Sequence, residues 1–223
     1  MNKNLIQIHI NDSIANITID NPPKNELKMS FFEEFAECIA QISENKAIKG
    51  VIISGQGRHF SSGADTNELF GLFKNNKTIP DEITKNSSVF EQFRNLQIPT
   101  IACITGVCLG SATELALNAH FRFAGTSALI GLPEAEFGVI PGLGGIVNTQ
   151  KLVGTYKTLE LILKADSVSS EEALELGIID YITNKNELLN QAHLFIKSLP
   201  DNYNVIRKKE YLKRINSNTI DNA

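Results

Sequence analysis

The stretch from Ile98 to Asn118 constrains the fold more than any other part of the chain. It reads IPTIACITGVCLGSATELALN, in which an apolar run over residues 100–104 is followed by two glycines and then by a helix-forming segment over residues 111–117. This order predicts a strand, a glycine-bearing turn and a buried helix. The first amides of a helix have no partner within it and the helix dipole is positive there, so such a place can hold developing negative charge on an oxygen.

Glu114 falls within the first turn of this predicted helix. One interpretation is that its carboxylate merely complements the helix dipole. The other is that the carboxylate hangs over the same point as the free amides, which would make half of an active site. The stretch alone leaves both interpretations open.

The rest of the chain predicts a mixed α/β protein. Alternating isoleucines over residues 6–19 indicate a β-hairpin, and Ser30 with Glu33 forms a capping box for a helix that ends near Asn45. Residues 66–87 are mostly polar, which favours a short helix followed by a mobile loop lining a substrate pocket. Further strands are expected at 50–55, 121–125, 128–132 and 178–182, and further helices at 89–96, 146–152, 156–165, 170–176 and 188–199.

Composition excludes several functional classes. The chain has 223 residues, 42% of them hydrophobic and 21% charged, which is an ordinary globular profile. Its formal net charge of −4 argues against a broad nucleic-acid surface, and no apolar run approaches membrane-spanning length. The N-terminus lacks a signal-peptide pattern, and the three cysteines suit a reducing compartment and show no metal-ligand spacing. We therefore expect a cytoplasmic protein with no membrane, nucleic-acid or metal partner.

Two further segments carry the small residues of a binding site. Gly63 and its small neighbours in residues 56–65 allow the backbone to approach a ligand closely, although a plain loop from strand to helix has the same composition. His59 in this loop is a candidate base, but a lone loop histidine is more often solvated or structural. The run from Leu132 to Gly145 holds Glu134 and is so rich in glycine and proline that its backbone path is tightly specified.

These three segments together resemble the crotonase (enoyl-CoA hydratase/isomerase) superfamily. The similarity rests on FSSGAD at residues 60–65, Gly106 through Glu114, and Leu132 through Gly145, and it extends from about Ile6 to Leu199. It implies an α/β fold, a crotonase-like spiral of ββα turns with a shortened C-terminal helical region. Residues 1–200 would form the core domain and residues 201–223 a short polar tail.

The resemblance also implies the roles of individual residues. The oxyanion-hole amides fall on Ala64 and Ser111, and the two catalytic carboxylates on Glu114 and Glu134. Two such amides can stabilise a thioester enolate, and two carboxylates around one water can act as base and acid for its addition. The remaining substrate-binding positions are Lys24, Ser62, Gly63, Asp65, Phe70 and Gly110.

The expected activity is that of an enoyl-CoA hydratase in fatty acid metabolism, which adds water reversibly and in syn geometry across a 2-enoyl thioester. No cofactor is expected, because coenzyme A is part of the substrate, and the expected assembly is a homotrimer or homohexamer. Ser111 and Ala112 replace the usual glycines, Glu26 replaces a small residue, and only Asp201 to Ala223 follow the core. The first alternative is a double-bond isomerase, in which Glu134 alone moves a proton. The departures leave room for two more: an enzyme acting on acyl-carrier-protein thioesters as in polyketide pathways, and a catalytically silent binding subunit.

Overall fold

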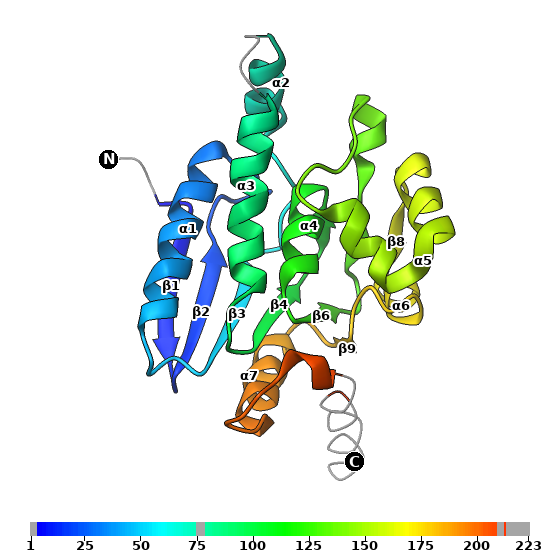
Figure 1. Ribbon diagram of the computed structural model, residues 1–223. Helices are drawn as coiled ribbons and strands as arrows, with labels where there is room; N and C mark the ends of the chain where they lie inside the picture. Colours follow the sequence, from blue (N-terminus) through cyan, green and yellow to red (C-terminus); the bar gives the residue numbers. More distant parts are fainter. Residues whose placement is uncertain (1–3, 75–78, 209–211, 213–223) are drawn as a thin grey trace.

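The computed structural model describes residues 4–74, 79–208 and 212, and within them two sheets and a set of covering helices (Figure 1). The main sheet has the strand order β1-β2-β3-β4-β6-β9, and a smaller sheet has the order β5-β7-β8. The strands are β1 (Ile6–Asn11), β2 (Ile14–Ile19), β3 (Gly50–Gly55), β4 (Thr100–Ile104), β5 (Val107–Leu109), β6 (Phe121–Gly125), β7 (Leu129–Gly131), β8 (Ser167–Ser169) and β9 (Tyr181–Thr183). The helices are α1 (Met29–Glu44), α2 (Thr66–Lys74), α3 (Ile79–Arg94), α4 (Ser111–Asn118), η1 (Pro133–Phe137), α5 (Gly145–Lys164), α6 (Ser170–Glu175), α7 (Leu188–Ser198) and η2 (Val205–Arg207).

The main sheet is a hairpin continued by parallel strands. β1 and β2 pair antiparallel, as the alternating isoleucines predict, whereas β2, β3, β4, β6 and β9 pair parallel. A parallel strand covered on both faces is apolar along its length, because successive side chains point to opposite faces. In β3 the Val51 and Ile53 side chains belong to one apolar core and Ile52 to the other.

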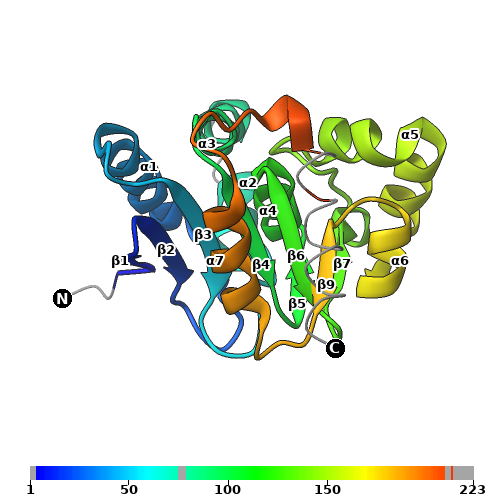
Figure 2. The same cartoon turned by 90° about the horizontal axis from the view of Figure 1, so that it is seen from below.

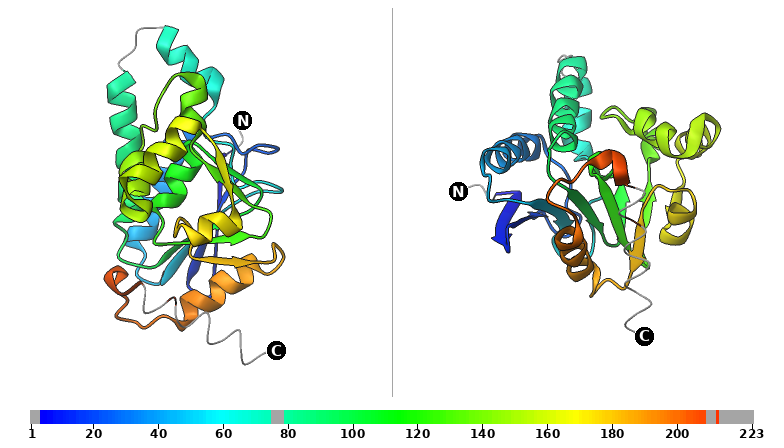
Figure 3. Two further views of the ribbon diagram at one scale, coloured as in Figure 1. Left: turned by 90° about the vertical axis from the view of Figure 1, so that its right-hand side faces the viewer. Right: turned by 60° about the horizontal axis from the view of Figure 1, so that its bottom comes forward.

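The two cores lie beneath different helices. Helices α1, α3 and α4 lie side by side over one face of the sheet (Figure 1), and they contact one another in that order. Helix α7 contacts β3, β4 and β6, and its Phe195 packs against Phe121 and Phe123 in the second core (Figure 2). Helix α7 and η2 gather at one end of the molecule, and α2 lies at the opposite end (Figure 3).

The start of α1 differs from the prediction. The capping box at Ser30 is wrong, because the helix begins one residue earlier and its N-cap, Lys28, makes no side-chain hydrogen bond. Instead, the Met29 amide donates to the Glu68 carboxylate of α2 at 2.7 Å. A carboxylate from 39 residues away thus satisfies an amide that a local cap would otherwise hold. Helix α6, by contrast, has a local cap, since Ser169 accepts from the Glu172 amide at 3.2 Å.

Residues 66–87 were predicted as a short helix followed by a mobile loop; the short helix is present as α2, whereas the loop is wrong over residues 79–87, which are helical. Residues 66–74 and 79–94 form α2 and α3, and only residues 75–78 lie outside the described residues. The apolar side chains that bind α3 to the core, Val89, Phe90 and Phe93, all lie in its second half. The first half carries no comparable apolar stripe, so the hydrophobic pattern alone did not indicate a helix there.

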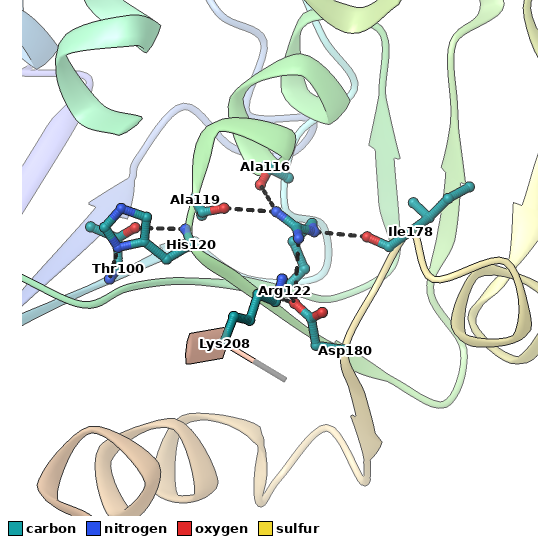
Figure 4. Close-up of polar contacts among 8 residues, drawn as sticks. All are labelled: Thr100, Ala116, Ala119, His120, Arg122, Ile178, Asp180 and Lys208. Atoms are coloured by element: carbon teal, nitrogen blue, oxygen red, sulfur yellow. Dashed lines mark hydrogen bonds and ion pairs between the residues drawn. The ribbon is translucent and has the colours of Figure 1, made fainter. Parts of the chain in front are cut away.

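A buried ionic cluster ties the end of the described chain to the sheet (Figure 4). The Arg122 guanidinium of β6 donates to the carbonyls of Ala119 and Ile178, both at 2.7 Å, and pairs with the Asp180 carboxylate at 3.4 Å. Lys208 donates to the same carboxylate at 2.7 Å. Burial is the main cause that lowers the pKa of Lys208 to about 8, and the nearby Arg122 charge adds to it. Among the described residues, no helix is long and apolar enough to cross a membrane.

Candidate active site

Residues 56–65, here called the first loop, connect β3 to α2. Their backbone pairs with Leu27 and leaves the Ala64 amide outside this pairing. Leu27 donates to the Gly63 carbonyl at 2.8 Å and accepts from the Asp65 amide at 3.1 Å, so the Ala64 amide between them takes no part in this bridge. Gly63 has a φ of +96°, and a Cβ there would lie 2.6 Å from the Leu109 carbonyl oxygen. Only glycine fits this close approach, which also turns the next peptide unit.

The same glycine brings the loop against the start of α4. The ideal Cβ position of Gly63 lies 3.5 Å from the Ser111 amide nitrogen. The first hydrogen bond of α4 runs from the Glu114 amide to the Gly110 carbonyl at 3.0 Å, so Ser111 precedes the internally bonded amides. Gly110 itself has a φ of +54°. Residues 107–109, predicted as part of a turn, form the short strand β5, which pairs with β7 and bridges to Ser61.

Glu114 is buried, with 1% of its surface exposed, and its carboxylate contacts the backbone at the start of α5. Its Oε1 accepts from the amides of Leu143 at 2.7 Å and Gly145 at 2.8 Å. Burial raises the pKa of Glu114 to about 8, repulsion from Glu134 adds to the increase, and the two amides oppose it. A Cβ on Gly145 would stand 3.0 Å from the Glu114 side chain, so this contact requires a glycine.

Glu134 lies on the short helix η1. Its Oε1 lies 3.3 Å from the ideal Cβ position of Gly110, which places the carboxylate over the start of α4. Its Oε2 is buried and accepts no hydrogen bond from any residue that the structure describes. Burial raises the pKa of Glu134 to about 7. Because both pKa values are raised, the pair retains a proton near neutral pH and titrates as a coupled unit.

One cavity of about 340 Å³ contains Ala64, Asp65, Ser111, Glu114 and Glu134 in its wall. The other lining residues are mainly apolar, with three further polar side chains. They are Leu27, Met29, Phe32, Glu68, Leu69, Glu82, Ile83, Asn86, Val139, Ile140, Gly142 and Leu143. An enclosed apolar site with a few convergent polar groups is typical of small-molecule sites.

Several predicted substrate-binding residues lie outside this wall. Ser62, Gly63 and Gly110 support it through the backbone, while Phe70 is 38% exposed and its ring lies 6.3 Å from that of Phe137. Lys24 is exposed and pairs with Glu26 at 3.4 Å. A second cavity, of about 840 Å³, lies at the other end of α1 between residues such as Ile42 and Tyr203, and none of the predicted site residues lines it.

His59 in the first loop and Asn25, between β2 and α1, make structural contacts. His59 accepts from the Val107 amide through Nδ1 at 3.1 Å, which agrees with the structural interpretation of this histidine. Asn25 is fully buried, and its amide donates to the carbonyls of Gln56 and His59. These contacts hold the loop that leads to Ala64. Within residues 4–74, 79–208 and 212, no group of three or more His, Cys, Asp or Glu side chains is arranged to hold a metal ion.

The sequence analysis placed residues 66–87 at a pocket, which is confirmed, but it missed that α3 forms this wall as a helix and that α1 contributes to it. Met29, Phe32, Ile83 and Asn86 line the cavity, but Ile83 and Asn86 fall in the stretch taken for a mobile loop. Met29 and Phe32 belong to a helical face that predicts core packing, and nothing in the local pattern separates a cavity wall from the core.

Comparison with known proteins agrees with the fold. The family model described as enoyl-CoA hydratase/isomerase matches residues 9–219. A probable enoyl-CoA hydratase of Bacillus subtilis is 38% identical over 176 residues, which cover 79% of this chain and 68% of that protein. The fatty acid oxidation complex subunit alpha of Idiomarina loihiensis is 32% identical over 168 residues, which cover 75% of this chain but 23% of the relative's length. The crystal structure of an enoyl-CoA hydratase from Bacillus anthracis superimposes with a TM-score of 0.83 at 26% identity, covering 98% of this chain and 92% of that one.

Proposed function

The chain belongs to the enoyl-CoA hydratase/isomerase family, and we propose from this premise that it is an enoyl-CoA hydratase. The observation that carries the proposal is the single cavity in which two carboxylates, Glu114 and Glu134, face the wall that contains Ala64 and Ser111. Its substrate is a 2-enoyl thioester of coenzyme A, and the reaction needs no further cofactor.

The amides of Ala64 and Ser111 bind the thioester carbonyl oxygen in the proposed mechanism. Neither amide is used in the backbone pairing around it, so both can donate to the negative charge that grows on this oxygen as the enolate forms. Burial of the site strengthens such donation, because water does not compete for the oxygen.

Glu114 and Glu134 then make the proton transfers that add water to the double bond. One ionised carboxylate takes a proton from water as its oxygen bonds to the β-carbon, and the protonated carboxyl delivers a proton to the α-carbon. The raised pKa values of Glu114 and Glu134 suit this division, since near neutral pH the pair holds one proton and one charge. Water is consumed, the double bond is lost, and the pair regains its single proton.

One observation favours an isomerase as the second candidate. Two amides hold Glu114 Oε1, whereas Glu134 Oε2 has no hydrogen-bond donor among the described residues. A double-bond isomerase needs a single mobile base, and Glu134 alone would serve as one. In that case Glu114 would position residues 143–145 and move no proton.

An absorbance assay tests the proposal. Loss of the conjugated enoyl absorbance is measured on a panel of 2-enoyl thioesters, each prepared on coenzyme A and on acyl-carrier protein, with the hydrated product identified by mass. Hydration adds the mass of one water to the thioester, whereas isomerisation changes its absorbance and leaves its mass unchanged. Failure to convert any member of the panel would contradict both candidates.

We further propose a cytoplasmic homo-oligomer, a trimer or a hexamer. Three apolar side chains of α5 project outward at helical spacing: Tyr156, Leu159 and Leu163 are 84%, 50% and 72% exposed. A stripe of this kind on a single chain is typical of a protein interface. The three cysteines are all free and buried, as in proteins of reducing compartments.

A further inference from the structure

One polar side chain in the cavity has no role in the proposed reaction. Asn86 of α3 lines the cavity and is 7% exposed, among apolar neighbours that include Leu27 and Phe32. Both of these neighbours are nearly fully buried, whereas Ile140, on the same cavity wall, is 68% exposed. Asn86 therefore lies in the deep part of the cavity and not at its mouth.

The Asn86 amide lacks a strong partner in the described part of the chain. The only hydrogen bond that its side chain makes there runs from Nδ2 to the Met29 sulfur at 3.9 Å. A thioether is a weak acceptor, and an amide can make four hydrogen bonds. An amide that the protein bonds this weakly keeps hydrogen-bonding capacity for a group that enters the cavity, and an apolar group there would leave that capacity unused.

The charges of the cavity restrict what that partner can be. Five carboxylates line it and none of its described lining residues is basic: Asp65, Glu68, Glu82, Glu114 and Glu134. An anionic group on the acyl chain would be repelled by the ionised members of this set, with no basic side chain among the described lining residues to offset the repulsion. An amide both donates and accepts, so it suits a neutral oxygen such as a hydroxyl or a carbonyl.

We propose that Asn86 selects 2-enoyl thioesters whose acyl chain carries a neutral hydrogen-bonding oxygen, in preference to plain aliphatic or dicarboxylic chains. This inference rests on the proposed hydratase function and names its substrate class. Discrimination follows because a plain chain leaves the Asn86 amide buried without a partner, whereas a hydroxyl restores its hydrogen bonds.

The test compares matched thioesters on one enzyme preparation. The probes are hex-, hept- and oct-2-enoyl-CoA, the analogues in which a hydroxyl replaces the terminal methyl group, and those in which a carboxylate replaces it. For wild type we expect kcat/KM at one chain length to be about tenfold higher with the hydroxyl than with the methyl group, as one net hydrogen bond predicts. The carboxylate should be the poorest of the three.

Asn86→Leu should remove this preference, because leucine has nearly the same volume and no polar group. The hydroxyl-to-methyl ratio should fall to about one or below. The ratio does not depend on the fraction of folded enzyme, since both substrates are measured on the same sample. Asn67→Leu, the same change on the exposed surface of α2, is the matched control and should leave the ratio unchanged. Asn86→Ser is the second variant if leucine prevents folding, and it should lower the ratio as well.

The outcomes separate the inference from the function on which it rests. A wild-type enzyme that hydrates the plain chains with no preference for the hydroxyl overturns the inference but leaves the hydratase intact. A preference that survives Asn86→Leu also overturns it, and the amide would then bond only to water. If wild type hydrates no member of the panel, the hydratase proposal fails and the inference fails with it.

Discussion

Glu114 combines two backbone hydrogen bonds with almost complete burial, and Glu134 stands across the same cavity. The amides hold one carboxylate oxygen of Glu114 in place. Burial and mutual repulsion nevertheless raise its pKa far above the usual value near 4.5. At the scale of single residues, this site keeps carboxyl groups in an environment that disfavours their charge, which is a common condition for acid–base catalysis.

Replacing each carboxylate by its amide distinguishes hydration from isomerisation. Glu114→Gln and Glu134→Gln are nearly isosteric, and loss of a positioned acid or base lowers rates by about 10²–10⁴. For a hydratase, each variant should lose that much of kcat for hydration, and the double variant should be little worse than the poorer single one. Steady-state kinetics on the enoyl-thioester panel measures this. A Glu114→Gln enzyme that keeps wild-type turnover while Glu134→Gln is inactive would favour the isomerase.

The same glutamate makes stability depend on pH. Its pKa rises from near 4.5 in the unfolded chain to about 8 in the folded protein, so the folded state binds more protons between these values. The free energy of unfolding contributed by Glu114 therefore falls as pH rises through this window. Because glutamine does not titrate, Glu114→Gln should stabilise the protein relative to wild type at pH 8, by up to a few kcal/mol, and much less at pH 5. Urea unfolding at both pH values tests this, and an equal gain at both would contradict it.

At the scale of elements, the site depends on close contact between the first loop and the β5–α4 turn. Gly63 makes this contact possible, since its positive φ and the 2.6 Å approach to the Leu109 carbonyl exclude a side chain. This packing brings Ala64 and Ser111, the proposed oxyanion donors, into the wall of one cavity. Small changes in this packing would move both donors away from the substrate oxygen.

A pair of glycine-to-alanine substitutions tests this dependence. Gly63→Ala should destabilise the fold by about 1–3 kcal/mol and lower kcat by at least about tenfold, through backbone strain and displacement of the Ala64 amide. Gly71→Ala is the matched control, because a Cβ on Gly71 in α2 meets no atom within 4 Å, and alanine there should be neutral or slightly stabilising. Thermal unfolding and kcat are measured for both variants. Wild-type kcat in Gly63→Ala would show that the amide position is not set by this glycine.

At the scale of the whole molecule, helices cover both faces of the main sheet, while α5 keeps apolar side chains exposed. Leu163 and Tyr156 lie on this outer surface, one on each side of Leu159. The buried Arg122–Asp180–Lys208 cluster lies elsewhere, between β6 and the end of the described chain (Figure 4). The ionic contacts and the exposed apolar stripe of α5 thus lie in different parts of the structure.

We expect wild type to associate through α5, and Leu163→Lys to weaken that association. A lysine at the centre of an apolar interface should raise the dissociation constant by tenfold or more, on the order of 2 kcal/mol. Light scattering at micromolar concentrations measures the mass of both proteins. Leu194→Lys on α7, where the leucine is 52% exposed, is the control and should leave the mass unchanged. A monomeric wild type would contradict the prediction.

The sequence by itself determined those features whose signals are local. The β-hairpin, the strand before Gly106, the helix holding Glu114, the break at Gly154 and the positive φ of Gly63 each depend on residues a few positions apart. Alternation, capping and the conformational freedom of glycine act over that range, and they can be recognised without knowing what packs against them. The roles of Ala64, Ser111, Glu114 and Glu134 stay predictions that came from the family resemblance.

Only the tertiary structure decided which distant segments meet. It caps α1 with Glu68 and not with a local serine, and it holds Glu114 with amides 29 and 31 residues away. It also shows that the polar residues 79–87, predicted as part of a loop, belong to α3, which carries Asn86 in the cavity wall. Burial of a polar group depends on every element that surrounds it, and its pKa or missing hydrogen bond appears only when those elements are assembled. For that reason Glu114 and Glu134 could be proposed as a pair from the family resemblance, whereas Asn86, the side chain proposed to select the substrate, could not.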